Sequence, residues 1–544
     1  MRGLMMNRPL LVSSLIEFGA ENHADKLVVS RRVEGDVHHQ TFAETRDRVA
    51  QLAHALKALG INEEDRVATI AWNGHRHLEL YYAISGIGAV CHTINPRLFA
   101  EQLDYIVNHA ADRALFIDLT FVPIVEKMQG RFPSVEHVVI MTDRAHMPDT
   151  TIENALCFED LLDGQPTSYD WPDMDENTAA GLCYTSGTTG NPKGVLYSHR
   201  SHVLHALSVA SVDGFYLESR DVVLPVVPLF HVNAWGLPYI CFVTGTSLVF
   251  PGPNLDGASL FDLMDKENVT AAWGVPTVWL GLIGEMQKQG RKPAHLKSML
   301  IGGSAAPRAM IETFEKQHGL DIVHGWGMTE MSPIGTIGVL PSRYDETDMD
   351  ERINLKAKQG RRLFQVDMKI VDEDGNRQPH DGKTSGELYV RGPFITAGYY
   401  NDESASAGCF DAEGWFKTGD VATIDPEGFL LIVDRSKDLI KSGGEWISSI
   451  DLENAAIGHP DIVEAAAIGL PHPKWDERPL LVVVPREGAT VSKESILDHL
   501  ASRVAKWWLP DDIAFVEAIP HSATGKIRKT ELRDMFKDYT LPSA

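Results

Sequence analysis

Cysteine is scarce in this chain of 544 residues, which contains only five. They are odd in number, scattered along the sequence and never spaced as C-x-x-C; they are Cys91, Cys157, Cys183, Cys241 and Cys409. A disulfide framework or a cysteine zinc site needs paired or closely spaced thiols. The sequence therefore predicts free thiols and a reducing, cytoplasmic setting.

Long apolar runs and an excess of positive charge are also missing. The longest apolar stretch, residues 237–250, is broken by Thr-Gly-Thr and is too short to span a bilayer. The run 10–16 ends at Glu17 with no small-residue cleavage site after it, so we expect a first helix rather than a signal peptide. The net charge of -25 disfavours nucleic acid and anionic membranes as partners.

The most informative segment that is present runs from Tyr184 to Val195 and reads Tyr-Thr-Ser-Gly-Thr-Thr-Gly-Asn-Pro-Lys-Gly-Val. Its backbone N–H groups, hydroxyls and Lys193 are suited to wrapping an anion, most plausibly a nucleotide polyphosphate. It is not a Walker A loop, because Gly194 follows the lysine where Ser or Thr is required. The alternative is an ordinary surface turn, but turns rarely carry so many hydroxyls beside a lysine.

Helical and strand patterns alternate over about the first four hundred residues. Thr41-Phe-Ala-Glu44 is a capping box, and it predicts a helix that Gly60 closes. Buried strands are expected at 66–72, 114–118, 137–141, 270–275 and 298–301, and a further helix at 77–90. This alternation predicts an α/β fold in which helices cover largely parallel sheets.

From Gln365 onward the pattern changes to hairpins with Asp-Gly and Asp-Pro-Glu-Gly turns, which predict a small antiparallel β-barrel. Its expected strands include 367–371, 421–424 and 429–433. The last hundred residues or so predict a compact α+β unit, with strands near 463–469, 480–485 and 513–519 and a helix around 495–507. We therefore expect a large N-terminal domain, residues 1–436, and a small C-terminal domain, residues 437–544.

Six further motifs follow the segment 184–195 in order. They are Gly302-Gly-Ser-Ala-Ala-Pro307, Gly325-Trp-Gly-Met-Thr-Glu330, Thr418-Gly-Asp420, Asp434-Arg-Ser-Lys-Asp438, Lys441-Ser-Gly-Gly-Glu-Trp446 and Thr524-Gly-Lys526. With this series the chain resembles an acyl-CoA synthetase of the adenylate-forming (AMP-binding) superfamily over essentially its whole length. The resemblance implies an enzyme that uses ATP, Mg²⁺ and coenzyme A to activate a carboxylic acid, and it implies a homodimer.

The resemblance also implies a role for each motif. The residues that would cradle the β- and γ-phosphates are Thr185, Ser186, Gly187, Thr188, Thr189 and Lys193, and the nucleotide site would also include Gly302, Gly303, Ser304, Ala305 and Gly325. Glu330 would hold Mg²⁺, and Thr329 would contact the α-phosphate. Trp326 would lie against the adenine ring. Asp420 would accept both ribose hydroxyls, with help from Arg435.

Two half-reactions need two arrangements of the active site, and the resemblance implies that the small domain rotates about Lys437. In one arrangement the ammonium of Lys526 would reach the carboxylate and the α-phosphate together. In the other, the pantetheine arm of coenzyme A would enter a tunnel lined or flanked by Lys441, Gly443, Gly444 and Trp446. Glycines there would let the thiol approach the acyl-adenylate.

The acyl pocket is expected to combine residues 228–236 with Gly302, Gly303 and the residues after Glu330. His231 resembles the family's aromatic gate, although a core histidine on an apolar strand is the alternative. No aspartate stands in 228–236 to pair a substrate amine, so a simple monocarboxylic acid is favoured over an amino acid. Trp235 would fill volume and limit the acid to a short or medium chain.

Several alternatives stay open at this point. The motifs resemble 3-methylmercaptopropionate–CoA ligases of marine dimethylsulfoniopropionate breakdown and, next, medium-chain fatty acid–CoA ligases; these subgroups share every catalytic motif. A P-loop kinase is disfavoured by the missing Gly-Lys-Ser/Thr, and a hydrolase by the missing Gly-x-Ser-x-Gly. A non-catalytic AMP-binding module is disfavoured because Lys526 and Glu330 are both present.

Overall fold

A computed structural model describes residues 1, 3–185, 191–443, 445–521 and 526–543. The helices are α1 Ser13–Asn22, α2 Phe42–Ala58, α3 His75–Gly86, α4 Ala100–Ala110, α5 Val122–Lys127, α6 Phe158–Leu162, α7 His199–Val209, α8 Leu237–Thr244, α9 Gly257–Lys266, α10 Pro276–Gln289, α11 Arg308–Glu312, α12 Met349–Lys356, α13 Glu403–Ala407, α14 Ser449–Ile457, α15 Lys493–Ala501 and α16 Lys529–Met535. In the part of the chain so described, no helix has the length and apolar character needed to cross a membrane.

The first sheet has seven strands in the order β7-β6-β5-β3-β4-β8-β9. Its strands are β3 Arg66–Ile70, β4 Val90–Thr93, β5 Ala114–Ile117, β6 His137–Ile140, β7 Leu156–Cys157, β8 Ala179–Tyr184 and β9 Gly194–Ser198. Every neighbouring pair is parallel except β8 and β9, which form an antiparallel pair. The two ends of the segment 184–195 therefore belong to neighbouring antiparallel strands, in which Tyr184 pairs with Gly194, whereas a Walker A loop joins a strand to a helix.

The second sheet has nine strands in the order β16-β15-β14-β13-β12-β10-β11-β1-β2. Its strands are β1 Leu27–Arg31, β2 Val37–Thr41, β10 Val222–Pro225, β11 Ser247–Phe250, β12 Ala271–Gly274, β13 Ser298–Ile301, β14 Asp321–Gly327, β15 Ile334–Ile337 and β16 Arg361–Arg362. The central strands from β14 to β1 are parallel. The predicted largely parallel sheets are thus confirmed.

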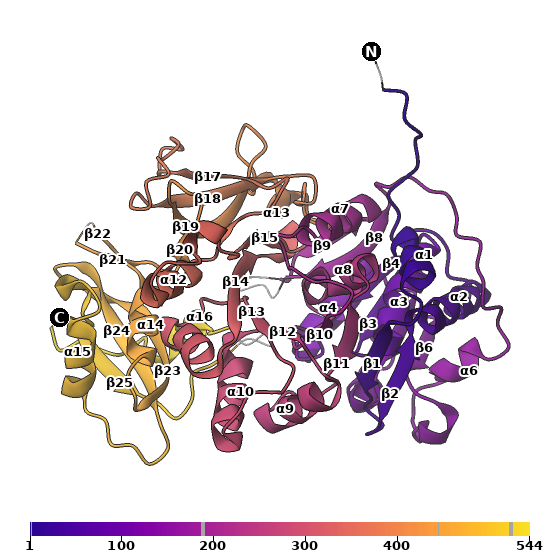
Figure 1. Cartoon of the computed structure of the whole chain (residues 1–544), viewed down its shortest axis with the longest axis horizontal. Helices are drawn as coiled ribbons and strands as arrows, with labels where there is room; N and C mark the ends of the chain where they lie inside the picture. Colours follow the sequence, from indigo (N-terminus) through magenta and orange to yellow (C-terminus); the bar gives the residue numbers. More distant parts are fainter. Residues whose placement is uncertain (2, 186–190, 444, 522–525, 544) are drawn as a thin grey trace.

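Helices separate and cover the two sheets, so the N-terminal part has five layers (Figure 1). Alternate residues of each strand face opposite layers: Val67 of β3 packs with α2, α3, α7 and α8 between the sheets, whereas its neighbour Ala68 packs with α4 and α5 on the outside. Helices α9, α10 and α11 cover the far face of the nine-stranded sheet. The predicted capping box is also present, since Thr41 and Glu44 bond reciprocally at the start of α2.

A four-stranded antiparallel sheet follows, in the order β17-β18-β19-β20. Its strands are β17 Asp367–Val371, β18 Gly386–Arg391, β19 Phe416–Ile424 and β20 Leu430–Arg435. The sequence predicts a small antiparallel β-barrel here. The outer strands β17 and β20 do not pair with each other in the described part of the chain, so the hairpins form an open sheet.

The C-terminal elements gather at the end of the molecule opposite the N-terminal ones, coloured orange to yellow in Figure 1. They form a five-stranded sheet from β21 Ile440–Ser442, β22 Glu445–Ile447, β23 Ile462–His472, β24 Asp476–Pro485 and β25 Asp512–Phe515. The expected α+β character is present. The expected helix 495–507 begins earlier, at Lys493, because the Ser492 side chain accepts a hydrogen bond from the backbone N–H of Ser495, and it ends at Ala501.

Candidate active site

A cavity of about 1040 Å³ opens where the carboxyl ends of several parallel strands meet the C-terminal elements. Residues that follow β10, β12, β13 and β14 line one side of it, and residues that follow β8 line another. Open α/β sheets bind ligands at this edge, because the loops after neighbouring strands converge there. The cavity is therefore the candidate active site, and most of the predicted site residues fall on or beside it.

The described ends of the segment 184–195 lie at the cavity. Thr185 and Lys193 face each other across the hairpin: the backbone N–H of Thr185 donates to the carbonyl of Lys193 at 2.9 Å, and the N–H of Lys193 donates to Oγ1 of Thr185 at 3.3 Å. Both residues line the cavity. The predicted phosphate-binding residues Ser186, Gly187, Thr188 and Thr189 lie outside the described residues.

Thr329 and Glu330 occupy a short turn directly after β14 and line the same cavity. Their backbone is held from both sides, because Tyr197 Oη donates to the Thr329 carbonyl at 2.7 Å and the N–H of Thr396 donates to the Glu330 carbonyl at 2.8 Å. The side chain of Glu330 is held separately: Oε1 accepts a hydrogen bond from Tyr399 Oη at 2.7 Å. The carboxylate is thereby aimed at the cavity before any ligand arrives.

Trp326 and Asp420 form a buried pair next to the cavity. Trp326 Nε1 donates to Asp420 Oδ2 at 2.9 Å, and Nε of Arg435 pairs with Asp420 Oδ1 at 2.8 Å. Trp326 and Asp420 are not among the residues that line the cavity, but Gly325, Gly327, Thr418 and Gly419 beside them are. The predicted adenine and ribose residues are thus brought together, with the carboxylate already fixed by two donors.

Lys526 reaches this cavity from the C-terminal part of the chain. Burial and, next, the charge of Arg435 lower the pKa of its ammonium to about 8, although Asp420 and Glu330 act in the opposite direction. Three residues later, buried Lys529 forms an ion pair with Glu453 at 2.7 Å, which anchors the start of α16. Lys526 therefore stands among the residues expected to bind ATP.

The predicted acyl wall has an unusual backbone. Val232, Asn233, Ala234 and Trp235 all have positive φ angles, between 44° and 58°, and form a left-handed turn. Such conformations cost energy in non-glycine residues and cluster at functional sites. The indole of Trp235 rests on Gly302: a Cβ placed on that glycine would lie 2.9 Å from Trp235 Cη2.

His231 precedes this turn and lines the cavity together with Gly303, Ser304 and Ala305. Burial and the charge of Lys526 lower the pKa of His231 to about 3, so its imidazole is neutral at ordinary pH. Its position at the cavity differs from that of a histidine enclosed in a core, and its role as an aromatic gate stays a prediction. A neutral ring there can orient an acid by hydrogen bonding but cannot neutralise its charge.

The residues expected near coenzyme A lie elsewhere. Lys441, Gly443 and Trp446 belong to the β21–β22 hairpin and do not line the cavity, and Gly444 lies outside the described residues. Trp446 is 41% exposed, with the Lys441 ammonium 5.4 Å from its ring centroid. Gly443 has φ of 61°, and a Cβ on it would lie 2.7 Å from the Trp475 ring, so only glycine fits there.

Comparisons with known proteins agree with this geometry. The model of the AMP-binding enzyme family matches residues 16–400, and that of the AMP-binding enzyme C-terminal domain matches residues 451–526. The chain belongs to the AMP-binding enzyme family. It is 49% identical to a 3-methylmercaptopropionyl-CoA ligase of Ruegeria lacuscaerulensis over 99% of both chains. It is 47% identical to a medium-chain-fatty-acid–CoA ligase of Ectopseudomonas oleovorans over 100% of this chain and 99% of the other.

A solved structure has the same architecture as this AMP-binding enzyme. The anthranilate CoA ligase AuaEII, in complex with anthranoyl-AMP, superposes with a TM-score of 0.88 at 25% identity and covers 99% of both chains. The sheet arrangement described above is thus that of an adenylate-forming ligase. The match extends through the C-terminal elements that carry Lys526.

Two residues that hold the site of this AMP-binding enzyme were missed by sequence reasoning, namely Tyr399 and Tyr197. Neither lies in a glycine-rich or charged motif, and each acts on residues far away in the chain: Tyr197 and Thr329 are 132 positions apart.

Lys437, predicted as the hinge, lines the cavity, and its carbonyl accepts a hydrogen bond from Arg533 at 3.4 Å.

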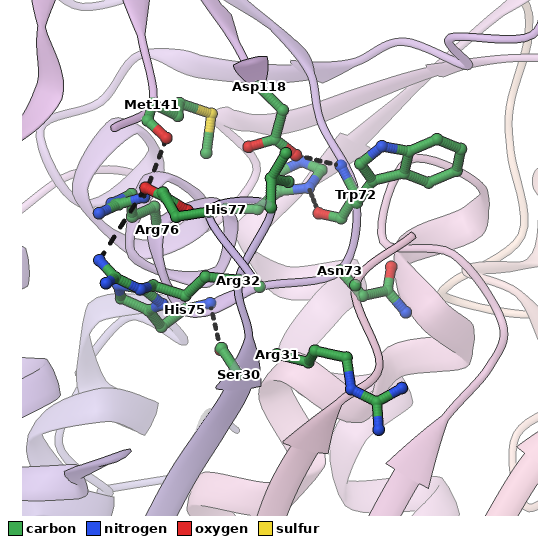
Figure 2. Close-up of a pocket in the computed structure, with 14 residues that line it drawn as sticks. Ser30, Arg31, Arg32, Trp72, Asn73, His75, Arg76, His77, Asp118 and Met141 are labelled. Atoms are coloured by element: carbon green, nitrogen blue, oxygen red, sulfur yellow. Dashed lines mark hydrogen bonds and ion pairs between the residues drawn. The ribbon is translucent and has the colours of Figure 1, made fainter. Parts of the chain in front are cut away.

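A second, much smaller pocket of about 30 Å³ lies at the carboxyl ends of β1, β3 and β5 (Figure 2). An ion-pair network fills its surroundings. Arg76 pairs with Glu34 at 2.6 Å and with Glu159 at 2.7 Å, and its guanidinium also donates to the carbonyl of Met141 at 2.9 Å. This space is too small for a nucleotide or an acyl chain, so we assign it a structural role.

Proposed function

We propose that this chain is an ATP-dependent acid–CoA ligase. It would join a short- or medium-chain carboxylic acid to coenzyme A through an acyl-adenylate. One observation carries the proposal: Lys526, from the C-terminal part, lies in one cavity with Glu330 and beside the Asp420–Arg435 pair. That arrangement brings a cation from one part of the chain to the nucleotide residues of another. Family membership and full-length relatives with CoA ligase names support the same activity.

In the first step, a carboxylate oxygen of the acid attacks the α-phosphorus of ATP, and the bond to the β-phosphate oxygen breaks to release pyrophosphate. Negative charge develops on oxygens that must be met by donors already in position. Lys193 would meet the β- and γ-phosphates, and Lys526 the α-phosphate and the carboxylate. Thr329 would contact the α-phosphate, while Asp420 and Arg435 hold the ribose.

In the second step, the thiol sulfur of coenzyme A attacks the acyl carbonyl, the bond to AMP breaks, and the thiol proton is lost to solvent. The hairpin with Lys441, Gly443 and Trp446 is away from the cavity in this arrangement. We propose that residues 437–544 move as a unit about Lys437 relative to residues 1–436, which would bring that hairpin to the acyl-adenylate.

The residues present fit a Mg²⁺ ion that arrives with ATP. The described residues contain no cluster of three or more acidic, histidine or cysteine side chains that could hold a metal alone. Glu330 offers a single carboxylate at the cavity, and Mg²⁺ is commonly bound by one carboxylate together with phosphate oxygens. When bound, the ion would neutralise charge on the phosphates. Glu330 would hold it.

For the acid, 3-methylmercaptopropionate is our first candidate and a medium-chain fatty acid the second. Identities of 49% and 47% to relatives named for these acids do not separate them. The packing of Trp235 on Gly302 supports a pocket of limited depth. The acidic composition, with a net charge of -25, fits a salt-rich setting. The marine breakdown of dimethylsulfoniopropionate takes place in such a setting.

The test is the product formed from ATP. Stoichiometric AMP and pyrophosphate that depend on both an organic acid and coenzyme A are expected. ADP and phosphate would point to a kinase or ATPase, and ATP binding without turnover to a non-catalytic AMP-binding module.

The homodimer and the cytoplasmic location implied by the sequence stay predictions, and the solution mass would test the first of them.

A further inference from the structure

Tyr399 lies between two oppositely charged residues of the active site. Its hydroxyl donates to Glu330 Oε1 at 2.7 Å, and the Lys193 ammonium sits 4.9 Å from the centroid of its ring. All three side chains border the cavity. One aromatic side chain thus contacts both the ammonium expected to bind phosphates and the carboxylate expected to bind Mg²⁺.

The backbone around Tyr399 joins the same two elements. The N–H of Thr396 donates to the Glu330 carbonyl at 2.8 Å, and the N–H of Tyr400 donates to the Gly194 carbonyl at 2.8 Å. The backbone N–H of Tyr399 itself donates to Ser406 Oγ at 2.9 Å. The connection between β18 and β19 therefore fixes Tyr399 relative to the start of β9 and to the turn after β14.

An ammonium and a carboxylate that border one partly desolvated cavity attract each other strongly. A direct ion pair between Lys193 and Glu330 would turn both groups away from their ligands. No such pair occurs among the described residues. The face of the tyrosine ring attracts the ammonium, while its hydroxyl occupies one oxygen of the carboxylate. The Lys193 ammonium and the Glu330 carboxylate are thus each contacted by the neutral tyrosine side chain rather than by one another.

We infer that Tyr399 is a positioning residue that keeps Lys193 and Glu330 apart and available, the first for the phosphates of ATP and the second for the accompanying Mg²⁺. The identity of these ligands rests on the proposed function. The separation of the two charges by one side chain rests on the contacts alone. Tyr399 acts through its two neighbours, so it should affect nucleotide and metal binding more than the fold.

The test measures ATP binding by calorimetry with no acid present, once in EDTA and once with Mg²⁺. Tyr399→Phe keeps the ring and loses the hydroxyl. Its affinity for ATP in EDTA should stay within about twofold of wild type, because the cation–π contact remains. The gain in affinity on adding Mg²⁺ should shrink by about tenfold, because Glu330 loses the hydrogen bond that aims it.

Tyr399→Leu removes both contacts, and Lys193 should then pair with Glu330. ATP affinity in EDTA should fall by about tenfold, the loss expected when a charged contact is diverted. Adding Glu330→Gln to this variant removes the competing anion and should restore most of that affinity. A purely structural tyrosine would give no such rescue. Thermal unfolding checks that each variant is folded.

Tyr344 provides a matched control, because its hydroxyl bonds to Glu427 and the Arg343 guanidinium lies 5.1 Å from its ring centroid, away from the cavity. Tyr344→Phe should leave ATP and Mg²⁺ binding unchanged. Failure of the wild-type chain to bind ATP or form AMP would count against the proposed function. If the wild-type chain forms AMP, two results would overturn the inference about Tyr399. One is unaltered ATP binding in Tyr399→Leu, and the other is that adding Glu330→Gln to this variant restores no affinity.

Discussion

The indole N–H of Trp326 donates a hydrogen bond of 2.9 Å to Oδ2 of Asp420. The family resemblance implies only a stacking role for Trp326 against adenine. The hydrogen bond gives Trp326 a second role, because it orients the Asp420 carboxylate, which we propose accepts the ribose hydroxyls. Arg435 holds the other oxygen at 2.8 Å, so Asp420 cannot rotate without losing a donor.

Trp326→Phe should therefore weaken ATP binding. The ring face remains, but the hydrogen bond to a buried carboxylate is lost, which costs about 1.5–3 kcal/mol and raises KM for ATP by at least tenfold. The rate kcat at saturating ATP should change little. Steady-state kinetics measure this. In the Asp420→Asn background the same change should add almost nothing, whereas equal losses in both backgrounds would refute the coupling.

Lys526 makes the adenylation step sensitive to alkaline pH. Its pKa is lowered to about 8, first by burial and then by Arg435, so the ammonium is present below that pH and lost above it. Because the charged form is the one we propose to act, kcat/KM for adenylation should fall about tenfold per pH unit above pH 8. Pyrophosphate release across pH 6.5–10 measures it.

Lys526→Arg provides the control, because a guanidinium stays charged over this range. The variant should be slower overall but should lack the alkaline fall. Thioester formation from supplied acyl-adenylate should also lack it, and Lys526→Ala should lose the first half-reaction while sparing the second. An alkaline fall that persists in Lys526→Arg would assign the titration to another group.

The sequence located those parts of the molecule whose signals are local. The bounds of β13 and β17 were predicted correctly, because a glycine-containing turn, at Gly302 and at Asp374-Gly375, follows each short strand closely. The resemblance carried by the motifs implied most of the residues that share the cavity, but Lys441, Gly443 and Trp446 do not line it. The β8–β9 pair escaped prediction, since residues 185–193 separate the two strands and a hairpin signal needs a separation of only a few residues.

Relations between distant positions could not be predicted in this way. Tyr399 and Glu330 are 69 positions apart, and nothing near Tyr399 in the sequence signals a polar contact. The open sheet β17–β20 also differs from the expected barrel, because hairpin patterns define neighbouring strands but not whether the outer two meet. Such features depend on how separate elements pack.

Arg76 should matter for stability rather than for activity. Its side chain is 7% exposed, and that of its partner Glu34 only 2%. Arg76→Met would leave buried Glu34 with only the Thr142 hydroxyl and the more distant Arg32 guanidinium, 3.9 Å away, a change that costs up to about 3–5 kcal/mol of unfolding free energy. Urea unfolding measures this. The exposed pair Arg144–Asp160 is the control, and Arg144→Met should cost under about 1 kcal/mol. Equal effects of the two changes would contradict the assignment.

Trp235 should set the length of acid that the enzyme accepts. Its indole lies on Gly302 and borders the cavity, so it occupies space that a longer chain would need. In the wild-type enzyme, kcat/KM should rise about four- to tenfold per methylene that fits, and stop rising near four to eight heavy atoms beyond the carboxylate. A panel of acids from acetate through butyrate and 3-methylmercaptopropionate to octanoate and palmitate, assayed by AMP release, measures this.

Trp235→Ala should then shift the optimum toward octanoate or longer acids and lower activity on butyrate, because short acids lose the surface on which they pack. Trp235→Phe should shift it less, since most of the ring volume remains. ATP affinity should stay unchanged in both variants, because the nucleotide contacts lie on other residues. An unshifted profile in Trp235→Ala would show that another residue forms the end of the pocket, and a wild-type optimum at palmitate would refute the short pocket itself.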